Sequence, residues 1–254
     1  MILHGSSIWR LVDSGTVSPE FSVAADEAIL NARLREFVPN TLHFYIRSCP
    51  CVSIGYNVCL KESVAMDEIG KRNVRLVRRF SGGSAVYTDQ GQLIYALIID
   101  SSFLPGDLVE SYKRICGAVI RGLSYLGVIA EHKPVNDIIV NGLKISGSAQ
   151  LRRGGIVLNH GTVMVDTDLD TLAAVIRPGK TKRSDPLVFK RVTCLREVLG
   201  KAPDMREVKR VLIQGISETF GITFNERSLT PGEMSDIERL IREKYASQQW
   251  TWRI

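Results

Sequence analysis

The chain has 254 residues, of which 44% are hydrophobic and 24% are charged, and its formal net charge is +6. These values are ordinary for a soluble globular protein with a packed core. No apolar run approaches the length that spans a membrane, and no basic segment followed by an apolar one marks a signal peptide. The positive charge suggests an anionic partner, such as a nucleotide, an acidic protein or a nucleic acid, but solvated surface charge explains it equally well.

The five cysteines are odd in number and scattered, which argues against a disulfide framework. Cys49 and Cys51 form a Cys-Pro-Cys segment, but no second pair completes a zinc site. We therefore expect reduced thiols and a cytoplasmic protein.

The first half of the chain alternates short apolar runs with helical patterns. A strand is expected at 8–12, followed by a helix at 19–37 that Ser18 or Ser22 would cap. The next apolar runs predict strands at 42–46, 51–54, 74–77 and 93–99, with a short helix at 64–71. An apolar stripe predicts the clearest helix at 107–126, and Gly127 lies where a glycine would end it.

The second half begins with strands at 137–140, 144–148 and 156–165, and Asn141-Gly142 is a strong signal for a tight hairpin. A short helix is expected at 169–176, a basic mobile loop at 177–191, and two helices at 205–220 and 231–245. Hairpins mixed with helices predict an α+β fold, with mixed or antiparallel sheets packed against helices. We expect one domain over residues 1–254, without a linker.

A first candidate for chemistry is residues 78–87, where Arg78 and Arg79 precede Phe-Ser-Gly-Gly-Ser-Ala-Val-Tyr. Glycines let backbone N–H groups approach a ligand and form an anion-binding nest, and an arginine adds a fork suited to phosphate. A plain hairpin turn with solvated arginines explains the segment as well. It is neither a P-loop nor a dinucleotide fingerprint.

A second candidate is the hairpin at 136–150, which should bring Asp137 and Lys144 close together on paired strands. Such a lysine can stabilise charge that builds on a carbonyl or phosphate oxygen, and a lone aspartate can help to hold Mg²⁺. On this segment alone, ordinary solvated positions are the favoured interpretation of both residues. His160, in an Asn-His-Gly-Thr strand, is either a substrate contact or a satisfied core residue.

Taken together, these segments resemble the lipoate–protein ligase family, which shares a superfamily with lipoyl/octanoyl transferases and biotin–protein ligases. The resemblance rests on residues 78–89, on Asn136-Asp137 with residues 142–149, and on residues 160–162. Smaller similarities include residues 26–28 and 54–56, and the match follows the family order over nearly the whole chain. It implies a biotin/lipoate protein ligase-like catalytic domain.

The family implies an ATP- and Mg²⁺-dependent reaction, in which lipoate forms lipoyl-AMP and a lysine of an acceptor protein then takes the lipoyl group. Carried over, Lys144 is the expected catalytic residue. ATP or lipoyl-AMP would be bound by Arg79, Gly82, Gly83, Ser84, Ala85, Val86, Tyr87 and Lys144. Further expected site residues are Arg78, Ser81, Asn136, Asp137, Ser146, Gly147, His160 and Thr162, with Asp137 as the candidate Mg²⁺ ligand.

Three departures qualify this resemblance. Ser84 replaces a third glycine, Thr88 replaces a histidine, and the small C-terminal domain of bacterial ligases is not found in this sequence. We therefore expect a separate small accessory subunit, beside a lipoyl-domain or H-protein acceptor.

Three alternatives remain open. A lipoyl or octanoyl transferase that works through a thioester needs a reactive cysteine, and residues 132–191 contain none. A nucleic-acid-binding regulator would use the basic segment, but no aromatic–basic pattern supports base stacking. The third alternative is biotin in place of lipoate as the substrate. The sequence segments resemble the lipoate branch of the superfamily more than the biotin branch.

Overall fold

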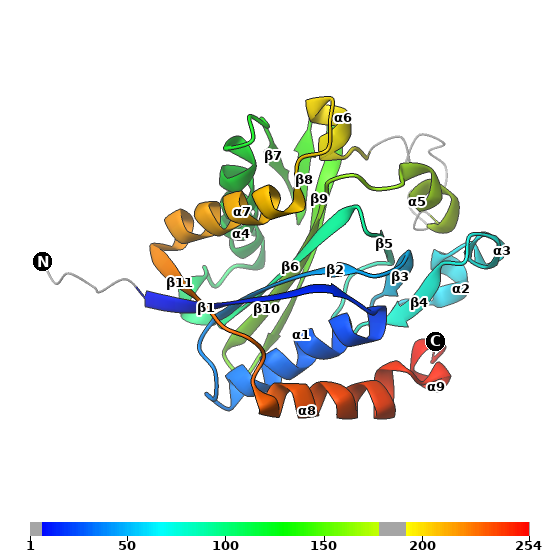
Figure 1. Cartoon of the computed structure of the whole chain (residues 1–254), viewed down its shortest axis with the longest axis horizontal. Helices are drawn as coiled ribbons and strands as arrows, with labels where there is room; N and C mark the ends of the chain where they lie inside the picture. Colours follow the sequence, from blue (N-terminus) through cyan, green and yellow to red (C-terminus); the bar gives the residue numbers. More distant parts are fainter. Residues whose placement is uncertain (1–6, 178–191, 254) are drawn as a thin grey trace, which may run out of the picture.

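The computed structural model describes residues 7–177 and 192–253, and two sheets organise it (Figure 1). The larger sheet has 8 strands in the order β11-β1-β2-β6-β10-β9-β8-β7, and the smaller has 3 in the order β4-β3-β5. Their strands are β1 (Ser7–Val17), β2 (Thr41–Arg47), β3 (Cys51–Ile54), β4 (Arg75–Arg78), β5 (Val86–Thr88), β6 (Gln92–Asp100), β7 (Glu131–Lys133), β8 (Asp137–Val140), β9 (Leu143–Arg153), β10 (Ile156–Met164) and β11 (Ile222–Glu226). Because β1 pairs in parallel with β2 and β11 whereas β6, β9 and β10 pair antiparallel, the predicted mixed α+β class is confirmed.

Helices cover both faces of the large sheet. The longer ones are α1 (Pro19–Leu34), α4 (Leu108–Ser124), α7 (Met205–Phe220) and α8 (Pro231–Leu240). The shorter ones are α2 (Leu60–Ser63), α3 (Met66–Lys71), α5 (Leu169–Val175), α6 (Leu195–Leu199), α9 (Gln248–Thr251), the 3-10 turn Ser101–Phe103 and the π-helical segment Ile241–Tyr245. Figure 1 shows α4 and α7 together on one side of the sheet and α1 with α8 on the other.

The main apolar core lies between the large sheet and the α4/α7 layer. It contains Trp9, Phe44, Leu97, Val119 and Leu212, all almost fully buried. The opposite face, which carries α1, has a smaller core around Ile29 and Ile98. That face also carries polar side chains, and the three-stranded sheet lies beside it.

Several local predictions are confirmed by the backbone. Ser18 caps α1, because its Oγ accepts the Phe21 N–H at 3.1 Å. Asn141 and Gly142 both have positive φ angles, 51° and 78°, as the predicted tight hairpin between β8 and β9 requires.

Other expectations need correction. The expected strand at 144–148 is the much longer β9, because residues 146–153 pair with residues 156–163 of β10. The expected helix at 231–245 is interrupted, since α8 passes into the π-helical segment after Leu240. The expected mobile loop at 177–191 lies outside the described residues except for Arg177.

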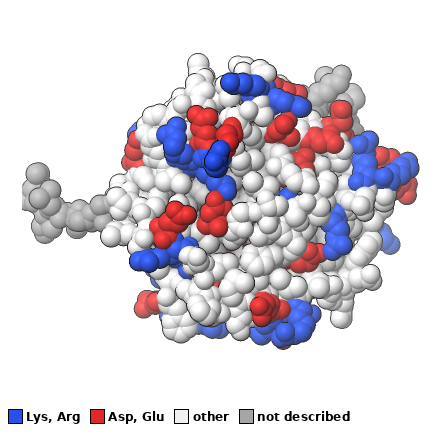
Figure 2. All heavy atoms as spheres, in the orientation of Figure 1, with Lys and Arg blue, Asp and Glu red and all other residues white. Residues whose placement is uncertain are grey.

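The face drawn in Figure 2 fits the interpretation that the charges form an ordinary solvated surface. Lys/Arg and Asp/Glu side chains are interspersed over the face drawn in Figure 2. In the described parts of the chain, no helix combines the length and apolar character needed to cross a membrane.

Candidate active site

A pocket lies where the α1-side face of the large sheet meets the small sheet and the loop that joins β4 to β5. We call residues 80–85 the Gly-rich loop. Strands β2, β6, β9 and β10 contribute Tyr45, Arg47, Gln92, Ile94, Lys144, Gly147, Ser148, Ala149, His160, Gly161, Thr162 and Met164. The other side consists of Val23, Ser53, Arg79, Gly83, Ser84, Ala85, Val86, Tyr87, Thr88, Asn136, Leu172, Ile176 and Val192.

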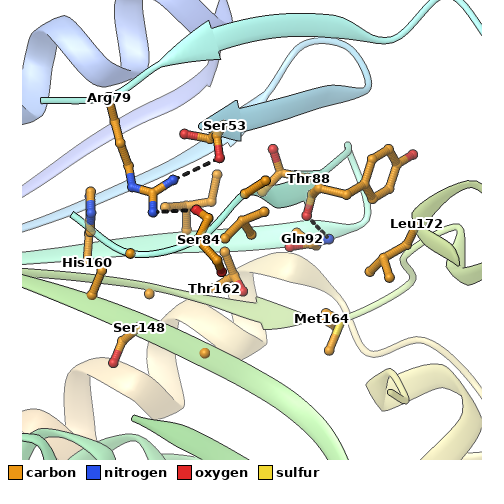
Figure 3. A pocket seen from close by; sticks show the side chains of 18 of the residues that line it. Ser53, Arg79, Ser84, Thr88, Gln92, Ser148, His160, Thr162, Met164 and Leu172 are labelled. Atoms are coloured by element: carbon orange, nitrogen blue, oxygen red, sulfur yellow. Dashed lines mark hydrogen bonds between the residues drawn. The ribbon is translucent and has the colours of Figure 1, made fainter. Parts of the chain in front are cut away.

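The Gly-rich loop is held in place by the Arg79 side chain. Its Nη1 donates to the Ser53 carbonyl at 2.8 Å, and its Nη2 donates to the Gly82 and Ser84 carbonyls at 2.7 and 2.8 Å (Figure 3). Burial, and then the positive charge of Arg47, lower the pKa of Arg79 to about 10, so it is still a cation at neutral pH. The Arg79 guanidinium, which was expected to suit a phosphate, is therefore engaged by backbone carbonyls, two of them in the Gly-rich loop.

Arg78, which was expected among the site residues, lies outside the pocket. Its guanidinium is fully buried and donates to the carbonyls of Gly55, Val58 and Thr251 at 2.8 to 3.1 Å. It does not line the pocket, so in this structure it joins the 55–58 turn to the C-terminal segment.

Lys144 and Asp137 meet as the hairpin predicted. Nζ of Lys144 lies 2.6 Å from Oδ1 of Asp137, and both side chains are partly exposed. The pair is possible because residue 147 is glycine: a Cβ there would lie 2.5 Å from Nζ. Lys144 and Gly147 line the pocket, whereas Asp137 does not.

The expected Mg²⁺ ligand, Asp137, does not belong to a protein-built donor set. Within residues 7–177 and 192–253, no group of three or more His, Cys, Asp or Glu side chains could hold a metal ion. The Asp137 carboxylate is already paired with the Lys144 ammonium. Asp137 as a Mg²⁺ ligand completed by phosphates and waters stays a prediction, and no chemistry is assigned to a metal here.

Behind the pocket, one buried carboxylate joins two histidines and a tyrosine. Asp26 of α1 accepts from Nδ1 of His43 and Nδ1 of His160, each at 3.1 Å, and from the Tyr45 hydroxyl at 3.1 Å. Nε2 of His160 lies 2.8 Å from Oγ of Ser81 in the Gly-rich loop. His160 thus lines the pocket and also has a hydrogen-bond partner at each ring nitrogen. It combines features of both interpretations made from the sequence.

The end of the pocket near β2 is polar and cationic. Arg47 is buried, and its Nη1 donates to Sγ of Cys51 at 3.0 Å, while its Nε has no partner among the described residues. Oγ of Ser53 and Oε1 of Gln92 are also buried, and neither has a partner within residues 7–177 and 192–253. Burial raises the pKa of Cys51 to about 11, so the thiol next to Arg47 is uncharged at neutral pH.

The thiols of the chain lie elsewhere. Each of the five cysteines falls within the described residues and is free, and none lines this pocket. Cys116 is buried in the core on the α4 side, where burial raises its pKa to about 12. Cys51 and Cys194 are also buried.

The expected site residues divide into two groups. Eleven of them line the pocket, namely Arg79, Gly83, Ser84, Ala85, Val86, Tyr87, Asn136, Lys144, Gly147, His160 and Thr162. Gly82, Arg78, Ser81, Asp137 and Ser146 do not. The two departures noted above, Ser84 and Thr88, both face the pocket.

Tyr45, Arg47 and Gln92 were not expected as pocket residues: Tyr45 lies inside an expected strand, and Arg47 and Gln92 lie one residue outside the strands expected at 42–46 and 93–99. Asp26 entered only as part of the resemblance. A stronger signal was available, since an aspartate between Ala25 and Ala28 falls on the apolar side of a predicted helix. A buried carboxylate of that kind needs partners.

The sequence of the chain is similar to that of a known protein family. Residues 18–217 match the family model of the lipoyl protein ligase A/B catalytic domain. Octanoyltransferase LipM of Moorella thermoacetica is 32% identical over 266 residues, which cover 95% of this chain and 97% of that protein.

Two solved structures are also similar along their whole length. One, from a structural analysis of an archaeal bipartite lipoate protein ligase and its E2 lipoyl domain from Thermoplasma acidophilum, has a TM-score of 0.84 at 32% identity. The match covers 97% of this chain and 96% of that one. The other, a lipoate-protein ligase A bound with ATP, has a TM-score of 0.84 at 31% identity and covers 96% of this chain and 98% of that one.

The comparisons correct the predicted reaction. Curated relatives from Geobacillus kaustophilus and Kyrpidia tusciae carry the same octanoyltransferase name as the Moorella protein. The prediction of an ATP-dependent, AMP-forming ligase is therefore wrong, although both solved structures above are ligases, and the transferase alternative is the better supported. The resemblance itself is confirmed: the chain belongs to the lipoyl protein ligase A/B catalytic-domain family.

Proposed function

We propose that this protein is an acyltransferase that moves an octanoyl or lipoyl group from a carrier-protein thioester to a lysine of an acceptor protein of the lipoyl-domain or H-protein type. The pocket supports this most directly, because it combines apolar lining residues such as Ile94, Met164 and Leu172 with the Lys144 ammonium. A medium-length acyl chain fits the apolar part, and its carbonyl needs a positive neighbour. The names of the curated relatives point the same way.

We further propose that transfer is direct, without an acyl-cysteine intermediate. None of the five cysteines, all of which are among the described residues, lines the pocket, and the thiols of Cys51 and Cys116 are buried with raised pKa values of about 11 and about 12. A thiol nucleophile must be accessible and easily deprotonated, which these are not.

In the direct step, the acceptor amine nitrogen attacks the thioester carbonyl carbon. The C–N bond forms and the C–S bond breaks, and the electron pair leaves with sulfur. A proton from the attacking nitrogen then converts the thiolate into the carrier thiol. Negative charge develops on the carbonyl oxygen, and Lys144 is the pocket cation suited to stabilise it, with Asp137 at 2.6 Å holding its ammonium in position.

We propose that the chain acts as a single catalytic domain. The supporting observations are that β11 completes the sheet beside β1 and that α8 packs on α1, so both halves of the sequence build one sheet and its cover. The separate accessory subunit expected from the sequence stays a prediction, which the same assay addresses.

The test is a transfer assay with the purified chain, an octanoylated carrier and an unmodified lipoyl domain, followed by mass spectrometry of the intact acceptor. We expect octanoylation without ATP, and comparing the rate with and without an added subunit tests the accessory-subunit prediction. Lys144→Met should lower the rate about a hundredfold or more, since one charge-stabilising group is lost. Lys113→Met, which removes an exposed lysine of α4, is the control and should have no effect.

Two outcomes would contradict the proposal. Transfer that requires free octanoate with ATP and magnesium, and not the octanoylated carrier, would overturn the transferase assignment. An octanoyl group found on a cysteine of the enzyme after incubation with the donor alone would overturn direct transfer while leaving the transferase assignment intact.

A further inference from the structure

Besides the hydroxyl of Tyr45, which itself lines the pocket, the Asp26 carboxylate accepts from two histidine branches that lead to different places. One runs through His160 to Ser81 in the Gly-rich loop, and the other runs through His43 to Ser14 of β1. The two branches are nearly equal in geometry. Both histidines lie 3.1 Å from the carboxylate, and their Nε2 atoms lie 2.8 Å from Ser81 and 2.9 Å from Ser14.

The carboxylate fixes the direction of these hydrogen bonds. Asp26 is ionised at neutral pH, because hydrogen bonds from both histidines outweigh the effect of its burial and lower its pKa to about 2. An ionised carboxylate only accepts, so each Nδ1 carries the hydrogen. In the neutral imidazole Nε2 is then an acceptor, and the hydroxyls of Ser81 and Ser14 donate to it.

Only the first branch ends at the pocket. His160 lines it, and Ser81 immediately precedes Gly82 and Gly83, whose loop lies over it. The Ser81 carbonyl also accepts the Tyr56 N–H at 2.9 Å. The Gly-rich loop is thereby held at its start by Ser81 and further along by Arg79, which bonds the carbonyls of residues 82 and 84. His43 and Ser14, by contrast, do not line the pocket.

We propose that Asp26 is a positioning residue, which acts through His160 and Ser81 to hold the Gly-rich loop over the acyl pocket. The loop contains two adjacent glycines, and glycine has the greatest backbone freedom, so it needs such anchors to keep one conformation. Asp26 is buried and does not line the pocket. Its effect on the reaction rests on the proposed function, but its effect on the loop does not.

The test compares the two branches of the same carboxylate. Ser81→Ala and Ser14→Ala each remove one hydroxyl from a histidine Nε2, and His160→Gln and His43→Gln each remove one imidazole. The first readout is hydrogen–deuterium exchange of the amides at residues 81–87 in the full chain, which needs no substrate. We expect faster exchange there in Asp26→Asn, His160→Gln and Ser81→Ala, and unchanged exchange in His43→Gln and Ser14→Ala.

The second readout is the transfer assay, with kcat and KM measured separately for the octanoylated carrier. Variants of the His160 branch should lose about tenfold to a hundredfold in kcat/KM, because misplacement of the loop misplaces the acyl group. Variants of the His43 branch that keep their fold should retain the wild-type values.

The outcomes separate this inference from the proposed function. Equal loop exchange in the Ser81→Ala and Ser14→Ala proteins would overturn the positioning role, whatever the enzyme catalyses. Faster loop exchange confined to the His160 branch, in a protein that fails to transfer octanoyl groups, would overturn the proposed function and leave the positioning role standing.

Discussion

Gly147 leaves the space in which the Lys144 ammonium lies beside strand β9. A Cβ at this position would be 2.5 Å from Nζ and 3.3 Å from Oδ1 of Asp137. Because Nζ is the end of a flexible side chain, it can move away at little cost to the fold. Gly147→Ala should therefore slow acyl transfer about tenfold or more while leaving the unfolding midpoint nearly unchanged. The transfer assay and urea denaturation check the two halves of this prediction.

The matched control is Gly117→Ala in helix α4, where an added Cβ meets nothing within 4 Å. This variant should keep full activity and gain about 0.5–1 kcal/mol in the free energy of unfolding, since alanine is the better helix former. If Gly147→Ala were as active as Gly117→Ala, the position of Lys144 would not matter for transfer.

Asp26 also gives the protein a defined acid sensitivity. Burial alone would raise its pKa, but hydrogen bonds from His160 and His43 lower it from 3.8 to about 2. A lowered pKa contributes stability above the unfolded value, and that stability is lost as the pH falls from about 4 toward 2. The contribution is about 2 kcal/mol. The free energy of unfolding should fall less between pH 5 and pH 2.5 in Asp26→Asn than in the wild type, and parallel curves would contradict this assignment.

At the scale of elements, helix α8 is attached to β1 by a buried ion pair. Arg10 donates from Nη1 to Oε2 of Glu233 at 2.8 Å and from Nη2 to Oε1 at 2.5 Å. Glu233 also closes a capping box with Thr230 at the start of α8. Burial would raise the pKa of Glu233, but the bonds from Arg10 and Thr230 lower it, so the pair is charged at neutral pH.

Breaking this pair should be costly. Arg10→Met leaves the Glu233 carboxylate buried without its partner and should lower the free energy of unfolding by about 3–5 kcal/mol. The double variant Arg10→Met, Glu233→Met should recover much of that loss, because no lone charge remains. Urea denaturation of the wild type, both single variants and the double variant measures the coupling, and additive losses would argue against it.

Elements with a strong local pattern were predicted with accurate bounds. The apolar run Cys51–Ile54 and the amphipathic stripe of Met205–Phe220 are observed as expected. Strands β7 and β11 were missed because they are short and rich in polar residues. Their strand character comes from pairing with β8 and β1, which lies in the tertiary structure and not in the local sequence.

At the scale of the whole molecule, the sequence predicted which segments meet but not what each residue does there. The Gly-rich loop and the β8–β9 hairpin do share one pocket, as the resemblance implied. Arg79, however, bonds its own loop, a use that no spacing of residues reveals. The reaction was misassigned because motifs that build the pocket are shared across a family whose relatives are named both as transferases and as ligases.

The order of strands in the large sheet has a consequence for how the protein is made. Ser7 pairs with Ile222, so β1 cannot form its pairing with β11 until more than 200 further residues have been synthesised. The nascent chain emerges from the ribosome with its N-terminus first, so β1 emerges long before β11 has been synthesised. Until then its outer edge is open to other strands, and pairing across such a sequence separation is slow. We expect the nascent chain to need shielding of β1 during translation, and the sheet to be completed only after β11 has emerged.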